Sequence, residues 1–217
     1  MYCRTCRGPV RAGFARCYQC DVAHDRFGGL LADVVAPVAY AVKGSQLADD
    51  LWRYKSGLPG AAEAGAHLGS MLAVFLREHG GAVWRAAGMA GAPGLAAVVP
   101  SGQGRPGTHP LLDLVASCVH LPVVPLSTAP SAVARGRGAG DAVAAGWVTV
   151  AGPVAGADML LVDDTWVSGG SAQSAAAALK AAGARRVALV VLGRHLDPAD
   201  PRSARLLRAL RANARIP

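Results

Sequence analysis

Two adjacent carboxylates, Asp163 and Asp164, come at the end of a short apolar run and directly before a turn of small and hydroxylated residues. The apolar run is typical of a fully buried strand. Residues 171–180 include many strong helix formers, and Gly183 is placed as the C-terminal stop of a helix. The stretch therefore predicts a strand, a loop and a helix. In an open α/β sheet, ligands bind at the carboxyl ends of the strands, which is where this loop would lie.

The loop carries groups that bind an anion. Its small residues offer backbone N–H groups and hydroxyls at the start of the helix; they are Ser168, Gly169, Gly170 and Ser171. Free N–H groups and the positive end of the helix dipole favour a phosphate there. Carboxylates beside a phosphate would repel it unless they bind sugar hydroxyls or a divalent cation. A ribose 5-phosphate with Mg²⁺ satisfies both halves of the loop. The alternative is an ordinary polar turn between a buried strand and a helix.

The run from Leu160 to Ser171 resembles the phosphoribosyl pyrophosphate (PRPP) signature of type I phosphoribosyltransferases, in which apolar residues, two acidic residues and a Thr/Ser-Gly-x-Thr/Ser turn follow one another. The resemblance implies that Asp163 and Asp164 hold the ribose 2- and 3-hydroxyls. It also implies that the turn wraps the 5-phosphate with residues Thr165, Trp166, Val167, Ser168, Gly169, Gly170 and Ser171. Trp166 and Val167 stand where that family more often has small or hydroxylated residues.

Four of the five cysteines form two Cys-x-x-Cys pairs separated by ten residues; they are Cys3, Cys6, Cys17 and Cys20. Each pair can grip the same metal ion from a tight knuckle, so the spacing predicts one tetrahedral Zn²⁺ site with four cysteine ligands. Four thiolates leave no open coordination position, which indicates a structural rather than a catalytic zinc. Two disulfides are the alternative, and a reducing cytoplasm disfavours them. The fifth cysteine, Cys118, lies in an apolar helical context and is expected to be a buried small hydrophobe.

A second loop follows the apolar run 95–100, which predicts a buried strand. In the phosphoribosyltransferase family the equivalent strand ends in a loop that contacts pyrophosphate. Backbone N–H groups of residues 101–104, together with Arg105, could hold a diphosphate. We therefore assign to this site Ser101, Gly102 and, as a catalytic group with the two carboxylates, Arg105. The family's usual Arg-Gly-Phe-Asn-like segment is replaced here by residues 105–110, and an ordinary strand-to-helix turn is the alternative.

Residues 127–146 contain few apolar side chains and several prolines, glycines and arginines. A segment at this position resembles the flexible hood that closes over PRPP in this fold, although it is shorter than usual. Closure would bring Arg135 or Arg137 onto the leaving pyrophosphate and exclude water. A solvated basic loop is the alternative. His109, just before the next predicted helix, is either an acid–base group or a capping or surface residue, and its role stays open.

The elements that must position these groups alternate along the chain. Strands are predicted at 34–42, 95–100, 122–126, 147–150, 159–163 and 186–193, and helices at 46–55, 61–79, 108–119 and 171–182. Pro37 indicates that the first of these strands lies at a sheet edge. Strand–helix–strand order predicts an α/β fold, with a parallel sheet flanked by helices as in type I phosphoribosyltransferases. We divide the chain into a zinc-ribbon head, 1–28, and a phosphoribosyltransferase-like domain, 29–217.

The 217 residues carry a net charge of +8, which suits a polyanionic ligand or nucleic acid, although a composition rich in alanine, glycine and arginine gives the same figure. The tail, residues 201–217, is predicted to contain a short helix with leucines on one side and arginines around the rest. Such arginines usually form a solvated face; a nucleic-acid contact is the alternative, and the lack of interleaved aromatics counts against it. No apolar run approaches 18 residues, and the N-terminus lacks the layout of a signal peptide. We therefore expect no membrane span and a cytoplasmic location.

Taken together, the cysteine pairs, a short helix ending in Tyr54-Lys55-Ser56-Gly57 and the Asp163-Asp164 turn resemble the ComF-type competence proteins, which join a zinc ribbon to a phosphoribosyltransferase-like domain. The resemblance implies that a nitrogen nucleophile displaces pyrophosphate from C1 of PRPP, with Mg²⁺ on the pyrophosphate. No residue identifies the acceptor. ComF-type proteins are associated with DNA uptake in natural transformation. A non-catalytic accessory that binds single-stranded DNA or the uptake machinery is therefore one alternative, and a PRPP sensor is another. A homodimer is also left open.

Overall fold

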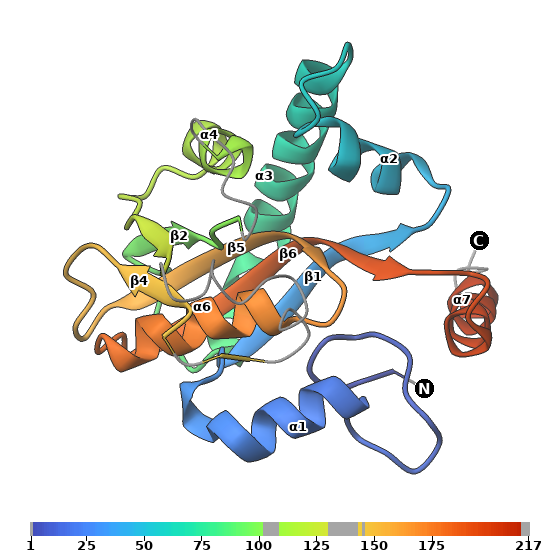
Figure 1. Cartoon of the computed structure of the whole chain (residues 1–217), viewed down its shortest axis with the longest axis horizontal. Coiled ribbons are helices and arrows are strands. Elements are labelled where there is room, and N and C mark those ends of the chain that lie inside the picture. Colours follow the sequence, from blue (N-terminus) through green and yellow to red (C-terminus); the bar gives the residue numbers. More distant parts are fainter. Residues whose placement is uncertain (1, 102–108, 130–142, 145, 214–217) are drawn as a thin grey trace.

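The computed structural model describes residues 2–101, 109–129, 143–144 and 146–213. Within these residues the centre of the molecule is a four-stranded parallel sheet in the order β1-β6-β5-β2 (Figure 1). Its strands are β1 (Val34–Val42), β2 (Leu95–Val98), β5 (Asp158–Trp166) and β6 (Arg186–Leu196). The predicted α/β architecture with a parallel sheet is confirmed. Strand β1, which contains Pro37, lies at an edge of the sheet as predicted.

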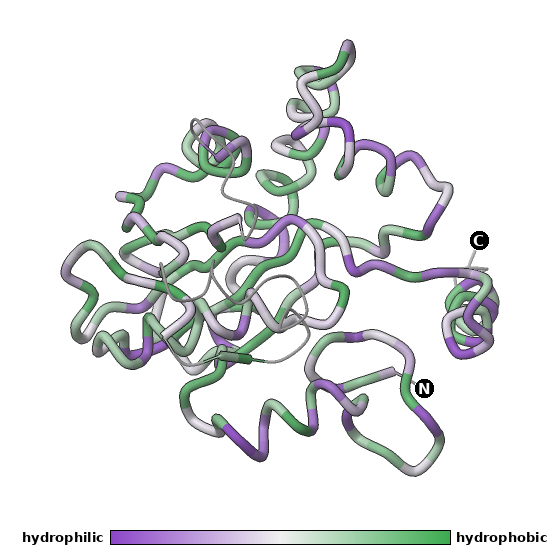
Figure 2. The backbone as a smooth tube through the Cα atoms, viewed as in Figure 1, coloured by the Kyte–Doolittle hydropathy of each residue, from purple (hydrophilic) through white to green (hydrophobic). Residues whose placement is uncertain are grey.

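Helices cover both faces of this sheet. On one face lie α2 (Gln46–Arg53), α3 (Ala61–Ala86) and α4 (Pro110–Cys118), and on the other lies α6 (Gly170–Ala181) (Figure 1). Side chains alternate between two hydrophobic clusters, because successive strand residues point to opposite faces. Leu160 and Val162 of β5 pack with α3 and α4, whereas Leu161 packs with α6. Figure 2 shows hydrophobic residues running along the central strands.

The remaining elements extend this core. The N-terminal segment ends in α1 (Tyr18–Phe27) and the short helix η1 (Gly28–Leu30), and a two-stranded antiparallel sheet pairs β3 (Leu126–Thr128) with β4 (Val148–Val150). Helix α7 (Pro201–Asn213) follows β6. Of the predicted strand 122–126, only Val123 bridges β2, at Ala96. Pro122 and Pro125 flank that residue, and proline has no N–H to donate to a ladder. None of the described helices is long and apolar enough to cross a bilayer.

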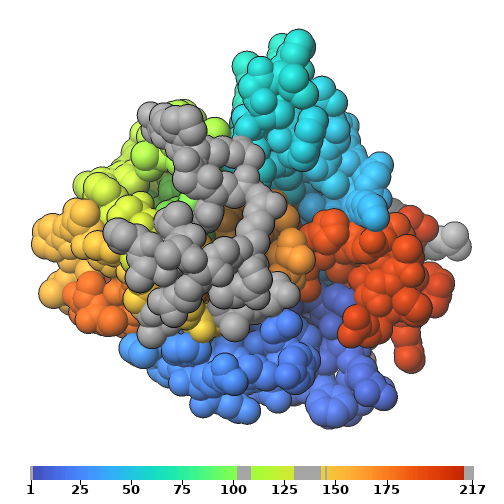
Figure 3. Space-filling model, viewed as in Figure 1, coloured from blue at the N-terminus to red at the C-terminus, as the bar shows by residue number. Residues whose placement is uncertain are grey.

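The N-terminal head packs directly on the α6 side of the sheet. Buried Cys3, Cys6 and Cys20 belong to the same hydrophobic cluster as the strand residues on that face. In the space-filling view, the head forms the lower part of the face shown, in dark blue (Figure 3). The head and the sheet therefore share one continuous core, and the division of the chain at residues 28 and 29 stays a prediction.

Candidate functional site

Strand β5 carries both acidic residues at its carboxyl end. The strand continues through them to Trp166, with Asp163 opposite Val191 and Thr165 opposite Gly193 of β6. The connection to α6 is therefore only residues 167–169, shorter than the predicted turn of 165–171. Because side chains alternate along a strand, Asp163 shares a face with Leu161, and Asp164 shares the opposite face with Val162.

Asp164 is held by the end of helix α2 and the residues that follow it. Its Oδ2 accepts hydrogen bonds from the hydroxyl of Tyr54 at 2.5 Å and from Nζ of Lys55 at 2.7 Å. The Asp164 side chain is 14% exposed and that of Lys55 is 28% exposed. Burial acts to raise the pKa of Asp164, but the Lys55 charge and the hydrogen bonds from Lys55 and Tyr54 outweigh burial and lower this pKa. Asp164 is therefore ionised at neutral pH.

Asp163 has a different environment. Its Oδ1 accepts the backbone N–H of Asp164 at 2.9 Å. Burial, reinforced by the neighbouring negative charge of Asp164, raises the pKa of Asp163 to about 8. Carboxyls whose pKa values are shifted in opposite directions by burial and by a charged partner are common at functional sites, although structural ion pairs produce such shifts too. The pair can therefore offer one carboxylate and one carboxyl that ionises when a suitable donor or cation binds.

The connection after β5 depends on Gly169. This residue has φ of +87°, and a Cβ built on it would lie 2.1 Å from the ring of Trp166. Trp166 itself is 2% exposed, so its ring cannot easily move away. Gly169 is also the N-cap of α6 and supplies no side-chain oxygen to the first turn, which contains no acidic residue. The start of α6 therefore has the properties of an anion site.

A cavity of about 270 Å³ lies between this helix start and the head. Ser168, Gly169 and Gly170 line one side. The head contributes several cationic side chains to the lining, namely Arg4, Arg7, Arg16 and Arg26. Positive charge thus surrounds the loop on its head side, which adds to the attraction for an anion.

The strand β2 ends near the same edge of the sheet. Thr128 Oγ1 donates to the carbonyl of Ser101 at 3.2 Å, which brings β3 to the end of β2. The other predicted residues of the pyrophosphate loop and hood, Gly102, Arg105, Arg135 and Arg137, lie outside the residues that the structure describes. His109 is the N-cap of α4, where its Nδ1 accepts the N–H of Leu111 at 3.2 Å. Of the roles considered for His109, the structure therefore shows that of a helix-capping residue.

The structure thus brings together Asp163, Asp164 and residues 165–171 at one end of β5, and it adds two residues that we did not assign to the site. These are Tyr54 and Lys55, which lie 110 and 109 residues before Asp164 in the sequence. A signal for them was available, because the segment 54–57 forms part of the ComF-type resemblance. Local sequence alone gave no indication that this segment meets β5.

The four paired cysteines form the second candidate site. Their sulfur atoms all lie within 4.8 Å of one another, and those of Cys6 and Cys17 are 3.8 Å apart. A tetrahedral Zn²⁺ with Zn–S bonds of about 2.3 Å requires sulfur separations of about 3.8 Å, so the cluster fits this ion. A hydrogen bond from Cys20 lowers the pKa of Cys17 to about 7. All five cysteines are free thiols, and the disulfide alternative is therefore not observed.

Comparison with known proteins gave partial similarities. No protein-family model and no curated protein matches the chain. A phosphoribosylpyrophosphate synthetase from Mycobacterium smegmatis is 20% identical over 62% of this chain and 36% of its own length, with a TM-score of 0.37. A purine phosphoribosyltransferase from Pyrococcus horikoshii is 14% identical over 62% of this chain and 87% of its own, with a TM-score of 0.36.

A hypoxanthine phosphoribosyltransferase from Staphylococcus aureus is 16% identical over 70% of this chain and 65% of its own, with a TM-score of 0.33. The chain thus spans about a third of the length of the synthetase and about two thirds of the length of the hypoxanthine enzyme. Because all three TM-scores are below 0.5, we base no conclusion about function on these similarities.

Proposed function

We propose that the chain binds PRPP with Mg²⁺ at the carboxyl end of β5 and acts as a phosphoribosyltransferase. The observation that carries this proposal is the arrangement of two carboxyls of different pKa beside a glycine-capped helix start. In this proposal Asp163 and Asp164 accept hydrogen bonds from the ribose hydroxyls, and the N–H groups of residues 168–171 bind the 5-phosphate. Lys55 lies beside Asp164 and offsets its negative charge, which would reduce the repulsion between this end of β5 and a polyanion.

The reaction we propose is displacement at C1 of the ribose. The bond from C1 to the pyrophosphate oxygen breaks, a bond from C1 to the acceptor nitrogen forms, and the acceptor loses a proton. Bound Mg²⁺ would neutralise charge on the departing pyrophosphate. The chain's own contribution is electrostatic: fixed carboxylate and N–H groups orient the sugar and stabilise the positive charge that develops on the ring. No described residue identifies the acceptor, which we leave as a nitrogen nucleophile.

Calorimetric titration with PRPP in the presence and absence of Mg²⁺ tests the binding step. We expect binding that requires Mg²⁺ and weakens about 10–100-fold in Asp163→Asn and in Asp164→Asn, the range for loss of a charge-assisted hydrogen bond. Asp49→Asn is the matched control, because Asp49 is exposed on α2 and bonds only Arg53 among the partners recorded for it. Equal PRPP affinity in all three variants would overturn the proposed site.

Turnover is tested separately by pyrophosphate release from PRPP across a panel of purine, pyrimidine and amine acceptors. Release with one acceptor class, lost in Asp164→Asn, supports the enzyme. Binding of PRPP without release from any acceptor supports instead a sensor that uses the same site. The two outcomes therefore separate catalysis from recognition.

A second candidate function is binding of single-stranded nucleic acid by the head. Three aromatic side chains there are exposed, Tyr2 by 51%, Phe14 by 63% and Tyr18 by 78%. Exposed arginines lie among them, at Arg4, Arg7 and Arg11, and the Arg7 guanidinium sits 5.4 Å from the Tyr2 ring centroid. Bases stack on aromatic rings while arginines contact the backbone, and this pairing favours single strands. The role in DNA uptake of the ComF-type proteins would draw on such a surface.

Fluorescence anisotropy with a labelled oligonucleotide tests this candidate. We expect affinity to fall steeply with salt and to fall about tenfold or more in the Tyr2→Ala/Phe14→Ala/Tyr18→Ala variant, since a base stack contributes about 1–3 kcal/mol. Trp52→Ala is the control, because Trp52 is 56% exposed on α2, outside the head. If the triple variant binds the oligonucleotide as tightly as the Trp52→Ala protein does, the head is not the nucleic-acid-binding surface.

A further inference from the structure

Arg194, near the carboxyl end of β6, is a buried cation at the junction between the sheet and the head. It is 8% exposed, and its Nη1 donates to the carbonyls of Trp166 at 2.9 Å and His195 at 2.8 Å. Both acceptors are neutral. A guanidinium stays protonated even when it is buried. Because neutral carbonyls do not balance its charge, Arg194 requires a negatively charged group nearby.

No anionic side chain in the described part of the chain provides that balance. Among these residues no ion pair includes Arg194, and its buried Nε has no hydrogen-bond partner there. An isolated buried charge is costly, and buried charges are therefore paired or held near a counter-ion. The arrangement indicates that the charge of Arg194 is balanced by an anionic group other than a carboxylate.

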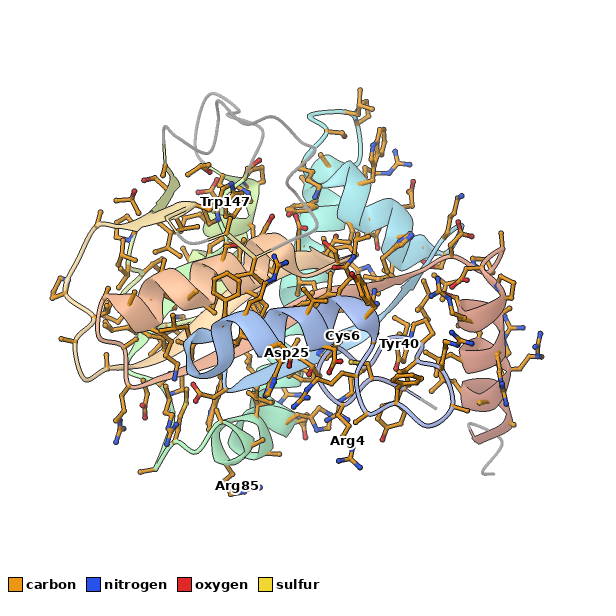
Figure 4. The ribbon with its side chains drawn as sticks, turned by 60° about the horizontal axis from the view of Figure 1, so that its bottom comes forward. Arg4, Cys6, Asp25, Tyr40, Arg85 and Trp147 are labelled. Carbon is orange, nitrogen blue, oxygen red and sulfur yellow. The ribbon has the colours of Figure 1, made fainter. Side chains whose placement is uncertain are left out.

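The guanidinium faces the first cysteine knuckle. A Cβ built on Gly8 would lie 2.2 Å from Nη2 and 2.8 Å from Nε and Cζ of Arg194, so the guanidinium packs against the Gly8 backbone. The carbonyl of Gly8 accepts the N–H of Cys3 at 2.8 Å and closes the knuckle. Tyr40 of β1 also contacts this knuckle, since its hydroxyl donates to the carbonyl of Arg7 at 2.9 Å. Figure 4 labels Cys6 and Tyr40 at this junction.

Four metal-bound thiolates around one Zn²⁺ carry a net charge of −2, because cysteines bind metal in the deprotonated form. We propose that Arg194 is the counter-charge of the metal-filled cysteine cluster and a positioning residue for it. This inference rests on Zn²⁺ binding by the four cysteines, whose geometry fits that ion, and not on PRPP binding. Arg194 also contacts the other candidate site, because its Nη1 donates a hydrogen bond to the Trp166 carbonyl at the end of β5. The metal site and the strand that carries the carboxyls thus share one side chain.

Chelator competition measures the zinc affinity of the folded chain and tests the proposal. Outer-shell partners of metal ligands typically change affinity about 10–100-fold when they are replaced, and we expect this loss in Arg194→Met. Arg194→Lys keeps the charge and should bind zinc more tightly than Arg194→Met. Arg77→Met is the control for loss of one arginine, since Arg77 lies exposed on α3 and bonds Glu78. If Arg194→Met binds zinc as tightly as Arg194→Lys and the wild type, Arg194 only fills space and the proposal is wrong.

A second variant approaches the contact from the head, in case Arg194→Met does not fold. Gly8→Ala should displace the guanidinium and weaken zinc binding by a similar factor. Gly29→Ala is its control, because a Cβ there meets nothing within 4 Å and its φ is not in the left-handed region. If the wild type binds zinc and Gly8→Ala binds it with the same affinity, the proposed role of Arg194 is wrong but the metal site itself is not. A wild-type protein that binds no zinc overturns the metal site as well.

Discussion

Lys55 and Asp164 lie 109 residues apart in the sequence, yet Nζ of the lysine is 2.7 Å from Oδ2 of the aspartate. The pair joins the end of α2 to the carboxyl end of β5, and Tyr54 donates to the same oxygen. Both charged side chains are largely shielded from water, so their attraction is screened less than that of a surface pair. The contact fixes one of the two carboxylates before any ligand arrives.

Lys55→Met is expected to destabilise the folded protein and to weaken PRPP binding. Loss of Lys55 removes the charge that lowers the pKa of Asp164, and we expect a stability loss of about 1–3 kcal/mol at pH 7, discounted for the partial exposure of the lysine. PRPP affinity should also fall about tenfold. Thermal unfolding and calorimetry measure the two effects.

The sign of the pH dependence follows from the lowered pKa of Asp164. Its stabilising contribution is present above the unfolded-state pKa of about 4 and is lost as pH falls through the folded-state value. The difference in stability between wild type and Lys55→Met should therefore shrink below pH 4. Lys43→Met is the control: Lys43 pairs with Asp197 at 3.2 Å but is 67% exposed, so its loss should change stability much less than the loss of Lys55.

Asp163 should make the protein less stable as pH rises. Its pKa is raised to about 8, so the folded state favours the protonated form, and the stability that this form gives is lost between about pH 4 and pH 8. The shift sets an upper limit of about 6 kcal/mol. We expect Asp163→Asn to match the wild type near pH 4 and to melt several degrees higher at pH 8.5 without ligand. A parallel pH profile for the two proteins, measured by thermal unfolding, would contradict this.

The same carboxyl should couple PRPP binding to proton release. If the ribose hydroxyls donate to ionised Asp163, binding must remove its proton at pH values below about 8. The apparent Kd should then fall about tenfold from pH 6 to pH 7 and level off above pH 8. Calorimetry in two buffers of different ionisation enthalpy measures the released proton directly. Asp163→Asn should bind weakly at every pH with no such slope, and a slope that survives in this variant would assign the proton to another group.

The sequence predicted the four strands of the parallel sheet and the positions of α2, α3, α4 and α6, because hydrophobic periodicity and glycine stops report local structure directly. It did not predict α1, it ended α3 at residue 79 instead of 86, and it placed the ends of two strands too early. Strand β6 was predicted to stop at Gly193, but that glycine lies within the strand, where a Cβ would sit 2.3 Å from Leu51 Cδ1 of α2. The glycine allows a helix to approach closely, which is a tertiary reason that a single sequence does not display.

Strand β5 was predicted to end at Asp163 for a similar reason. Adjacent acids break the apolar pattern, yet the backbone continues to pair with β6 through Trp166. The Asp164 side chain is bound by Lys55, which is 109 residues away in the sequence, and the Trp166 side chain is accommodated because Gly169, three residues later, has no Cβ. Motif spacing therefore predicted the cysteine cluster and a candidate site at the end of β5, whereas the distant partners of Asp164 required the fold.

We propose that the four cysteines bind a structural Zn²⁺, and its removal should unfold the head and lower the stability of the rest of the chain. The cysteines share a hydrophobic cluster with the sheet, and structural zinc contributes directly to folding. We expect a chelator to lower Tm by roughly 10 °C or more, and Cys17→Ser to do the same without chelator. Cys118→Ser is the matched control, because Cys118 lies on α4 and its thiol donates to the Leu114 carbonyl. A Tm that is insensitive to both the chelator and Cys17→Ser would remove the structural role from the cluster.

Gly169→Ala tests the contact between the loop and Trp166. An added methyl group would meet the buried ring at 2.1 Å, and the residue's φ of +87° is itself unfavourable for alanine. Gly156→Ala separates these effects, since Gly156 has φ of +72° but a Cβ there meets nothing within 4 Å. We expect the backbone strain alone to cost about 1 kcal/mol in Gly156→Ala and the overpacking to add about 1–3 kcal/mol in Gly169→Ala. PRPP affinity should fall only in Gly169→Ala, because only that substitution displaces the N–H groups at the start of α6. Unfolding and titration of both proteins measure this, and equal losses in the two variants would show that the Trp166 contact does not shape the loop.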